Sequence, residues 1–226
     1  MLVVISATFF MVHAAPGGPF DDDRVASPEI IKQLNETYNL NDPLISQLGN
    51  YLLNALQGDF GPSYKYPGRT VSELIASGLP ITAELAFYSV LFALLLGILS
   101  GIIASLYPGK FLDHFPMSVS MIGICVPSII LGPVLILTFG IWFEILPVSG
   151  WGEFSGDKIL PTITLGSAYA AIFARLTRGG MLEILAQDFI RTARAKGLNE
   201  TRVVFFHALR GGIMPTIGFL GPAIAG

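Results

Sequence analysis

The chain has 226 residues and a formal net charge of −3, with 52% hydrophobic but only 13% charged residues. A soluble domain carries about 25% charged residues, and the mean hydropathy here is +0.65. Composition therefore excludes an ordinary soluble domain and favours a membrane protein. The single cysteine, Cys125, excludes a disulfide framework and a cysteine-rich metal site, and we interpret it as a small buried apolar residue.

The N-terminal residues 1–13 are apolar but too few to cross a membrane, because a spanning helix needs about 20 residues. We interpret them as part of a first transmembrane helix. A secretory signal peptide is the alternative, although the positively charged beginning of such peptides is absent. Residues 14–78 are polar and rich in turn-forming residues, and we expect an extracytoplasmic loop with short helices at 28–38 and 43–56.

Residues 79–226 are predicted to form the transmembrane core, whose first span covers 85–109. Small residues recur at every fourth position of this span and lie on one helix face: Ser89, Ala93, Gly97, Gly101 and Ser105. Such a stripe lets a neighbouring helix approach closely in lipid. We predict a helix-packing seam against the small residues Gly166, Ala170 and Ala174.

The next apolar block, 115–143, is predicted to be a second span that contains three prolines. Proline removes backbone hydrogen bonds and kinks a helix, and in lipid the freed carbonyls need other partners. Pro127 and Ser128 therefore mark a kink that could line a transport pathway, or one that only shapes packing. A third apolar stretch, 159–174, ends at Arg175 and Arg178, whose long side chains are expected to reach the headgroups.

Between this stretch and a last apolar block from Gly211 lies a basic segment, which we interpret as two short helices hinged at Gly197. Glycine adopts positive φ without strain, and the Asn199 side chain can cap the helix that follows. Apolar residues of the second helix are expected to share a face: Val203, Phe206, Ala208 and Leu209. From these features alone, an amphipathic loop lying on lipid headgroups is an equally good interpretation.

Positive charge predicts the orientation of the chain. Eight of the thirteen Lys and Arg residues fall at the turn after the first span or between 175 and 212, whereas twelve of the sixteen acidic residues lie on the other side. The basic loop, 177–212, is therefore predicted to be cytoplasmic and the 14–78 loop external.

The same basic segment resembles a known motif. Three residues separate Ala193 from Gly197, and nine residues separate Gly197 from the run His207, Ala208 and Leu209. This pattern resembles the "EAA" loop of binding-protein-dependent ABC importer permeases. The pattern's Glu is replaced by Arg191 and its final Pro by Arg210, as is typical of the oligopeptide, dipeptide and nickel branch. The run GDFGPSYKY also resembles a loop of oligopeptide permeases.

The resemblance implies an all-α type I importer permease fold of about six helices, of which this sequence covers part of the first to part of the fifth. It therefore predicts a chain truncated at both ends. In this family the loop couples transport to a cytoplasmic ATPase. The coupling residues it implies are Arg191, Thr192, Ala193, Arg194, Ala195, Lys196, Gly197, Leu198, His207 and Leu209.

The resemblance also implies a homologous second permease, two ATP-binding subunits, an extracytoplasmic peptide-binding protein and a place in the bacterial cytoplasmic membrane, in contact with lipid. The expected function is one permease subunit of a peptide importer. A permease for dipeptides, nickel or glutathione is the alternative, and an ion-driven carrier or membrane enzyme is the rival from another class. No nucleic-acid partner is expected.

Several kinds of chemistry are missing from the sequence. It contains no G-x-x-x-x-G-K-[ST] motif, so it cannot hold ATP phosphates in a P-loop. Its three histidines lack metal-ligand spacing, and no serine has the surroundings of a nucleophile. We therefore predict no catalytic residue, no metal and no cofactor, and find no carboxylate pair within the spans of the kind that ion-driven carriers use.

Overall fold

The computed structural model describes residues 2–14, 42–63, 66, 68–154 and 156–225, which form two compact units, Met1–Leu79 and Pro80–Gly226. Within these residues the regular elements are helices, apart from one isolated antiparallel bridge between Pro62 and Thr70. The fold is therefore all-α, as predicted. The helix expected at 28–38 lies outside the described residues.

The described residues of the first unit include two short helices, α1 (Leu2–Ala14) and α3 (Leu44–Leu56). Helix α1 has 13 residues, about 20 Å at 1.5 Å per residue, which is shorter than a bilayer's hydrocarbon core. Helix α3 begins directly after Pro43, close to the expected start.

Helix α4 (Val71–Leu106) has 36 residues and starts well before the predicted first residue, 85. A capping box explains this early start. The N–H of Glu73 donates to Oγ1 of Thr70 at 3.1 Å, and the N–H of Thr70 donates to the Glu73 carboxylate at 3.2 Å. These bonds satisfy orphan donors of the first turn. The helix thus begins within the segment expected to be a loop, and Pro80 is accommodated inside it.

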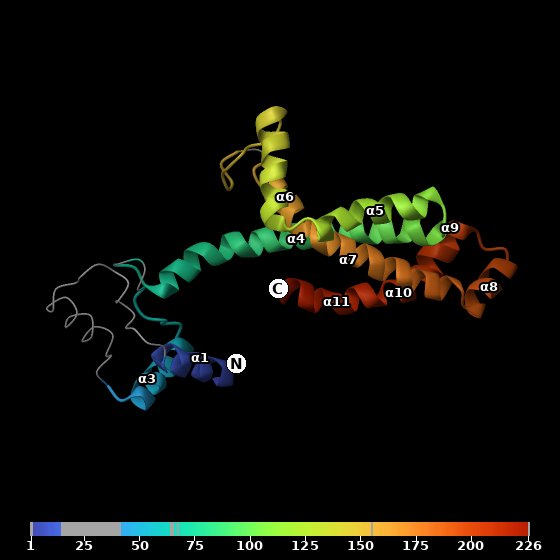
Figure 1. Cartoon of the computed structure of the whole chain (residues 1–226). Coiled ribbons are helices and arrows are strands. Elements are labelled where there is room, and N and C mark those ends of the chain that lie inside the picture. The colour runs from blue at the N-terminus through green and yellow to red at the C-terminus, as the bar shows by residue number, and fades with distance from the viewer. Residues whose placement is uncertain (1, 15–41, 64–65, 67, 155, 226) are drawn as a thin grey trace. The chain divides into compact units, whose positions relative to one another are not determined.

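The second unit is built around α7 (Ile159–Leu185), which continues eleven residues beyond the stretch 159–174 predicted from hydropathy. In Figure 1, α4, α5 (Phe111–Cys125) and α11 (Met214–Ala225) lie along it. The hydroxyls of Thr177 on α7 and Thr216 on α11 lie 2.9 Å apart and are both fully buried. Their hydrogen bond satisfies polar groups that would otherwise be buried without a partner.

The five small residues of α4 are all buried, and four of them lie against α7: Ser89, Ala93, Gly97 and Gly101. A Cβ atom added to Gly97 would lie 2.6 Å from Cβ of Phe173 and 2.8 Å from the carbonyl oxygen of Ala170. One added to Gly101 would lie 2.7 Å from the carbonyl oxygen of Ala174. The two backbones are thus in contact, and no side chain larger than hydrogen fits without separating them.

Ser89 and Ala93 lie along the same contact. A Cβ atom on Gly166 would lie 2.7 Å from the carbonyl oxygen of Ser89, and Ala93 is 0% exposed. Ser105 donates its hydroxyl to the carbonyl of Ile102 at 2.7 Å. The contact runs from Ser89 to Gly101 on α4 and from Gly166 to Arg178 on α7, which is about three turns of each helix.

The predicted second span is not one kinked helix. Helix α5 ends at Cys125, and α6 (Ser128–Leu135) continues as the π-helical segment η1 (Ile136–Trp142), bent by 108° from α5. Val126 is extended, with φ −97° and ψ 115°, because a residue before proline is disfavoured in helical geometry. Figure 1 shows α6 projecting away from α5. Cys125 lies exposed beside this break rather than buried.

An ion pair links α4 to the residue before α7. Glu84 accepts hydrogen bonds from the Lys158 ammonium and, at 3.1 Å, from the Trp151 indole. The ammonium also lies over the rings of Trp151 and Tyr88. The bonded carboxylate raises the pKa of Lys158 above its ordinary value.

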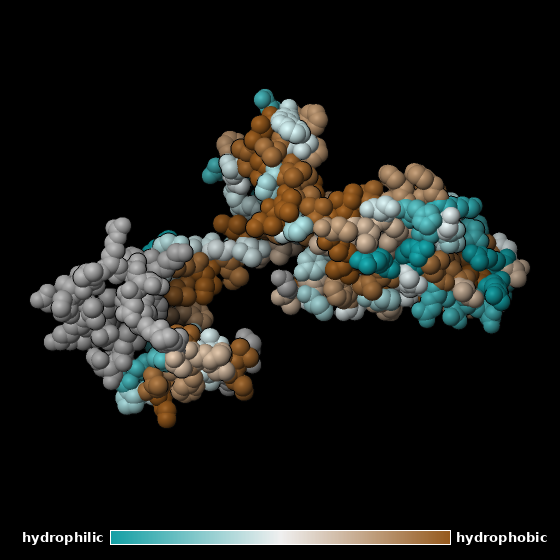
Figure 2. Space-filling view, viewed as in Figure 1, coloured by the Kyte–Doolittle hydropathy of each residue, from teal (hydrophilic) through white to brown (hydrophobic). Residues whose placement is uncertain are grey.

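Two helices of the described chain, α4 and α7, are long and apolar enough to cross a membrane, and the count rises to four if each of two bent helix pairs forms one span. Figure 2 shows hydrophobic residues over much of α6 and hydrophilic residues gathered where the second unit carries α8 and α9. The exposed apolar side chains, among them Ile129 at 81% and Trp142 at 75%, are those of a protein whose solvent is lipid.

A bulky residue at the seam tests its role. Gly97→Leu should separate α4 from α7, because overpacking costs about 1–3 kcal/mol and lipid supplies no hydrophobic force to hold the helices together. We expect normal membrane insertion but a lower thermal unfolding midpoint of the purified protein. Gly78→Leu is the control, since a Cβ atom there meets nothing within 4 Å. Equal midpoints for the two variants would contradict this role.

Candidate functional site

The basic segment forms a helix–turn–helix. Helix α8 (Asp188–Ala195) is followed by the turn at Gly197, then by α9 (Glu200–Arg202), the π-helical segment η2 (Val203–Ala208) and α10 (Leu209–Gly212). Gly197 has φ +78°, and its N–H donates to the carbonyl of Arg194 at 2.9 Å. A Cβ atom there would meet nothing within 4 Å. The backbone conformation, and not crowding, therefore requires glycine at this turn.

The second helix begins at Glu200 and is capped by Asn199, as predicted. The side-chain oxygen of Asn199 accepts the N–H of Arg202 at 3.1 Å. This bond satisfies one of the donors that a helix start leaves free.

The inner face of the helix–turn–helix packs on the rest of the second unit. A single buried apolar cluster joins both of its helices to α4 and α7, and consists of Ile102, Met181, Ile190, Ala193, Val203, Val204 and Ala208. The backbones also meet, because a Cβ atom on Gly212 would lie 3.0 Å from Cα of Met181 and one on Gly180 would overlap the Gly212 carbonyl.

The prediction that Phe206 lies on the apolar face was wrong. Phe206 is 63% exposed, whereas Val204 is 3% exposed and lies in the cluster. The prediction assumed an α-helical period, but this stretch is π-helical, and its wider turn changes which residues share a face.

The predicted coupling residues divide between two environments. Ala193 is buried, while Leu198, His207 and Leu209 are half-buried, and both leucines pack against the cluster. The other six are exposed: Arg191, Thr192, Arg194, Ala195, Lys196 and Gly197. Exposed aromatic residues accompany them, namely Phe189 at 52%, Phe205 at 53% and Phe206 at 63%. The outer face is thus basic and aromatic.

An ion pair spans the turn. Arg194 donates to both carboxylate oxygens of Glu200, at 2.7 and 3.1 Å. The bonded carboxylate raises the pKa of the Arg194 guanidinium further above its ordinary value. Both side chains are largely solvent-exposed, so the pair contributes at most about 1 kcal/mol and mainly orients the two helices.

A second ion pair was not predicted from the sequence. Arg178 was expected to reach the headgroups, but it donates two hydrogen bonds, at 2.6 and 2.7 Å, to Asp113 in the first turn of α5. The available signal was an Asp and an Arg bordering apolar segments, where charged residues usually pair.

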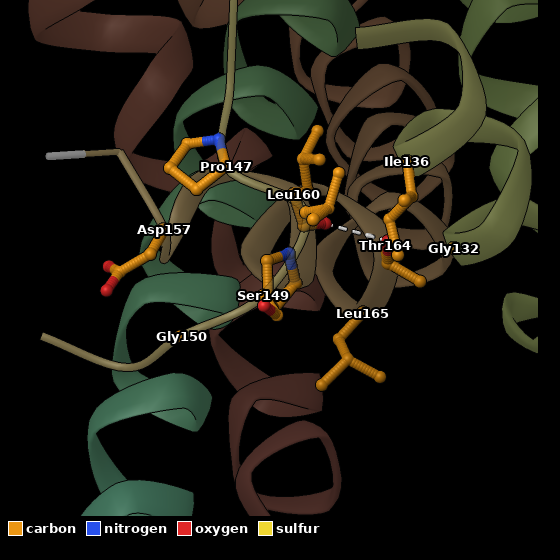
Figure 3. A pocket seen from close by; sticks show the side chains of 11 residues that line it. Gly132, Ile136, Pro147, Ser149, Gly150, Asp157, Leu160, Thr164 and Leu165 are labelled. Atoms are coloured by element: carbon orange, nitrogen blue, oxygen red, sulfur yellow. Dashed lines mark hydrogen bonds between the residues drawn. The ribbon is translucent and has the colours of Figure 1, made fainter. Parts of the chain in front are cut away.

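The predicted pathway residues, Pro127 and Ser128, are exposed at the break between α5 and α6. A cavity of about 260 Å³ opens further along the same helix, between α6, η1 and the start of α7. Figure 3 shows the residues that line this cavity. Among them, the Thr164 hydroxyl donates a hydrogen bond to the carbonyl of Leu160, at 2.7 Å. Neither Pro127 nor Ser128 lines this cavity, so their role in a pathway stays a prediction.

No group of three or more His, Cys, Asp or Glu residues with the spacing of a metal site occurs in the part of the chain that the structure describes.

Comparison with known proteins decides the family. The profile of the family described as "Binding-protein-dependent transport system inner membrane component" matches residues 93–226, which include most of the seam and the whole helix–turn–helix. The chain belongs to this family. It is a membrane transport permease.

Relatives that match the chain over its whole length support the same family. The chain is 40% identical to the oligopeptide transport system permease protein OppB of Salmonella typhimurium and 42% identical to that of Haemophilus influenzae, and covers 74% of each. It is 39% identical to the dipeptide transport system permease protein DppB of Bacillus subtilis, of which it covers 73%. In all three matches the whole chain is covered.

Paired alanine variants test which face of the second helix is buried. Val204→Ala should lower the free energy of unfolding by about 1–3 kcal/mol, because it removes buried methyl groups. Phe206→Ala should change it by less than about 0.5 kcal/mol, as exposed sites usually do. The measurement is thermal unfolding of the purified protein in detergent. A larger loss for Phe206→Ala would restore the α-helical assignment.

Proposed function

We propose that the chain is one permease subunit of an ATP-driven peptide importer, forms half of its translocation pore and couples to cytoplasmic ATPase subunits. One observation carries this proposal. The helix–turn–helix at 188–212, the proposed docking segment, is fixed to α7 by its inner face and presents a basic and aromatic outer face. A segment anchored on one side and exposed on the other is suited to dock a partner and transmit its movement. The names of the relatives supply the peptide class.

The proposed partners are a homologous second permease, two ATP-binding subunits and an extracytoplasmic peptide-binding protein. The sequence contains no P-loop motif, so ATP hydrolysis belongs to the ATP-binding subunits and not to this chain. The proposed docking residues are the ten predicted coupling residues, of which Ala193 acts by packing.

The proposed location is the bacterial cytoplasmic membrane, with several spans. Residues 1–13 belong to a first transmembrane helix, and the loop that follows lies outside the cell. The basic segment 177–212 faces the cytoplasm, in keeping with the excess of Lys and Arg there.

Dipeptides are the second candidate substrate, because relatives named as dipeptide permeases match the chain over its full length. Exchange of the binding protein would separate the two classes. Uptake of tetra- and pentapeptides alongside an oligopeptide-binding protein favours the first, and uptake of dipeptides only favours the second.

Substitution of Gly197 tests the coupling proposal. Gly197→Val should abolish peptide uptake by the assembled transporter, because φ is +78° there and a β-branched residue in this region costs about 1–2 kcal/mol. Gly197→Asn should retain partial uptake, because Asn tolerates this conformation. Uptake is measured with radiolabelled peptide in proteoliposomes.

The matched control is Gly152→Val, since Gly152 has φ +79° and its Cβ position is also open. It imposes the same strain outside the docking segment and should leave uptake unchanged. Normal uptake with normal peptide-stimulated ATP hydrolysis in Gly197→Val would remove the coupling assignment.

Labelling from one side of the membrane tests the topology. With Cys125 replaced by serine, Gln57→Cys should react with an impermeant maleimide added outside intact cells, and Thr201→Cys should react only after permeabilisation. Both positions are exposed in the structure, so burial would not explain a missing reaction. The opposite pattern would reverse the orientation and exclude docking of a cytoplasmic ATPase.

A further inference from the structure

Asp113 and Arg178 form the most enclosed ion pair of the described chain. The Asp113 side chain is only 3% exposed, and its two oxygens accept the Arg178 Nε and Nη2 at 2.6 and 2.7 Å. One of these oxygens also accepts the N–H of Gly109, at 2.9 Å. The two-point geometry fixes both the distance and the angle between the carboxylate and the guanidinium. The start of α5 is thereby fastened to α7.

The other end of α5 is fastened to α7 by its backbone. A Cβ atom on Gly123 would overlap the backbone of Ser167. Asp113 and Gly123 are about 15 Å apart along α5, and Ser167 and Arg178 are about 16 Å apart along α7, at 1.5 Å per residue. The two helices thus run antiparallel and are joined near both ends of α5, which makes them one mechanical unit.

On α7, Arg178 lies within one turn of the docking segment's attachment. Gly180 and Met181 meet the backbone of Gly212, and Met181 belongs to the cluster that holds Ile190 and Val203. At its far end, α5 stops at Cys125, where the chain bends by 108° into α6. A continuous chain of contacts therefore leads from the helix–turn–helix, through α7 and the ion pair, to the break.

We propose that Asp113 and Arg178 are positioning residues that make α5 move with α7, so that a displacement of the docking segment reaches the break at Val126 and Pro127. The proposal rests on the proposed function, because it assumes that a partner displaces that segment. It adds the route by which the movement reaches the membrane part of the permease. Removal of the Asp113 charge leaves Arg178 without its partner and frees the start of α5.

The chain provides its own reporter. Cys125 is its only cysteine, is exposed and is the last residue of α5. Its rate of reaction with a maleimide, followed by mass spectrometry of the peptide that contains it, reports the surroundings of the break. The experiment uses the reconstituted transporter with its partner subunits, and compares the nucleotide-free state with the state trapped by ATP and vanadate.

In the unaltered transporter the labelling rate of Cys125 should differ between the two states. In Asp113→Asn, which keeps the size of the side chain, the rate should no longer change, and uptake should fall about tenfold or more, while ATP hydrolysis continues. A merely structural role predicts a different result, because a loss of folding lowers ATP hydrolysis and peptide uptake together.

The control is Glu84→Gln. It neutralises the carboxylate of the ion pair with Lys158, which lies about 30 Å from Arg178 along α7. This variant should keep both the change in labelling and the uptake. If Asp113→Asn does not assemble, Arg178→Lys replaces it, because lysine keeps the charge but loses the two-point contact.

The proposal is overturned if an assembled Asp113→Asn or Arg178→Lys transporter shows the unaltered change in Cys125 labelling together with unaltered uptake. It is also overturned if hydrolysis and uptake fall in equal proportion. Failure of the proposed function gives a different result, in which the transporter with no substitution in this chain shows no dependence of uptake on the ATP-binding subunits.

Discussion

The close approach of α4 and α7 is the contact on which the second unit depends. Lipid is as apolar as the side chains it surrounds, so helices in a membrane are held by packing and hydrogen bonds and not by the hydrophobic effect. Gly97 and Gly101 bring the backbone of α4 onto that of α7, at distances that a single Cβ atom would violate. With α7 placed, α5, α11 and α10 pack against it.

Contacts with α4 and α7 determine the position of the proposed docking segment. Glycine contacts recur where α10 crosses α7, at Gly180 and Gly212, and the buried cluster beneath unites residues of α4, α7 and both helices of the segment. Its outer face remains exposed, charged and aromatic. The inner face is attached through backbone contacts and the buried cluster, and the outer face is accessible. The proposed coupling role requires both properties.

Three ion pairs connect elements of the second unit. Glu84 meets Lys158 at the start of α7, Asp113 meets Arg178 near its end, and Arg194 meets Glu200 across the turn at Gly197. Each pair joins segments distant in sequence or separated by a turn, so each fixes an angle that apolar packing alone leaves loose. The pair at Asp113 is the most buried of the three, which makes the loss of one partner the most costly.

The sequence by itself determined the membrane class, the family and the local devices, because these depend on composition and on residues close together in the chain. Examples are the glycine turn at 197, the Asn199 cap and the small residues at every fourth position of α4. The capping box at Thr70 and Glu73 is equally local, although it was not predicted. Only the tertiary structure decided what depends on distant residues or on a changed helical period. The 108° break at Pro127 replaced a kink, because a proline's effect on direction depends on what its neighbours pack against. Val204 and not Phe206 faces inward, because the π-helical turn changes the register, and Arg178 meets Asp113 because a folded chain can pair charges that lie 65 positions apart.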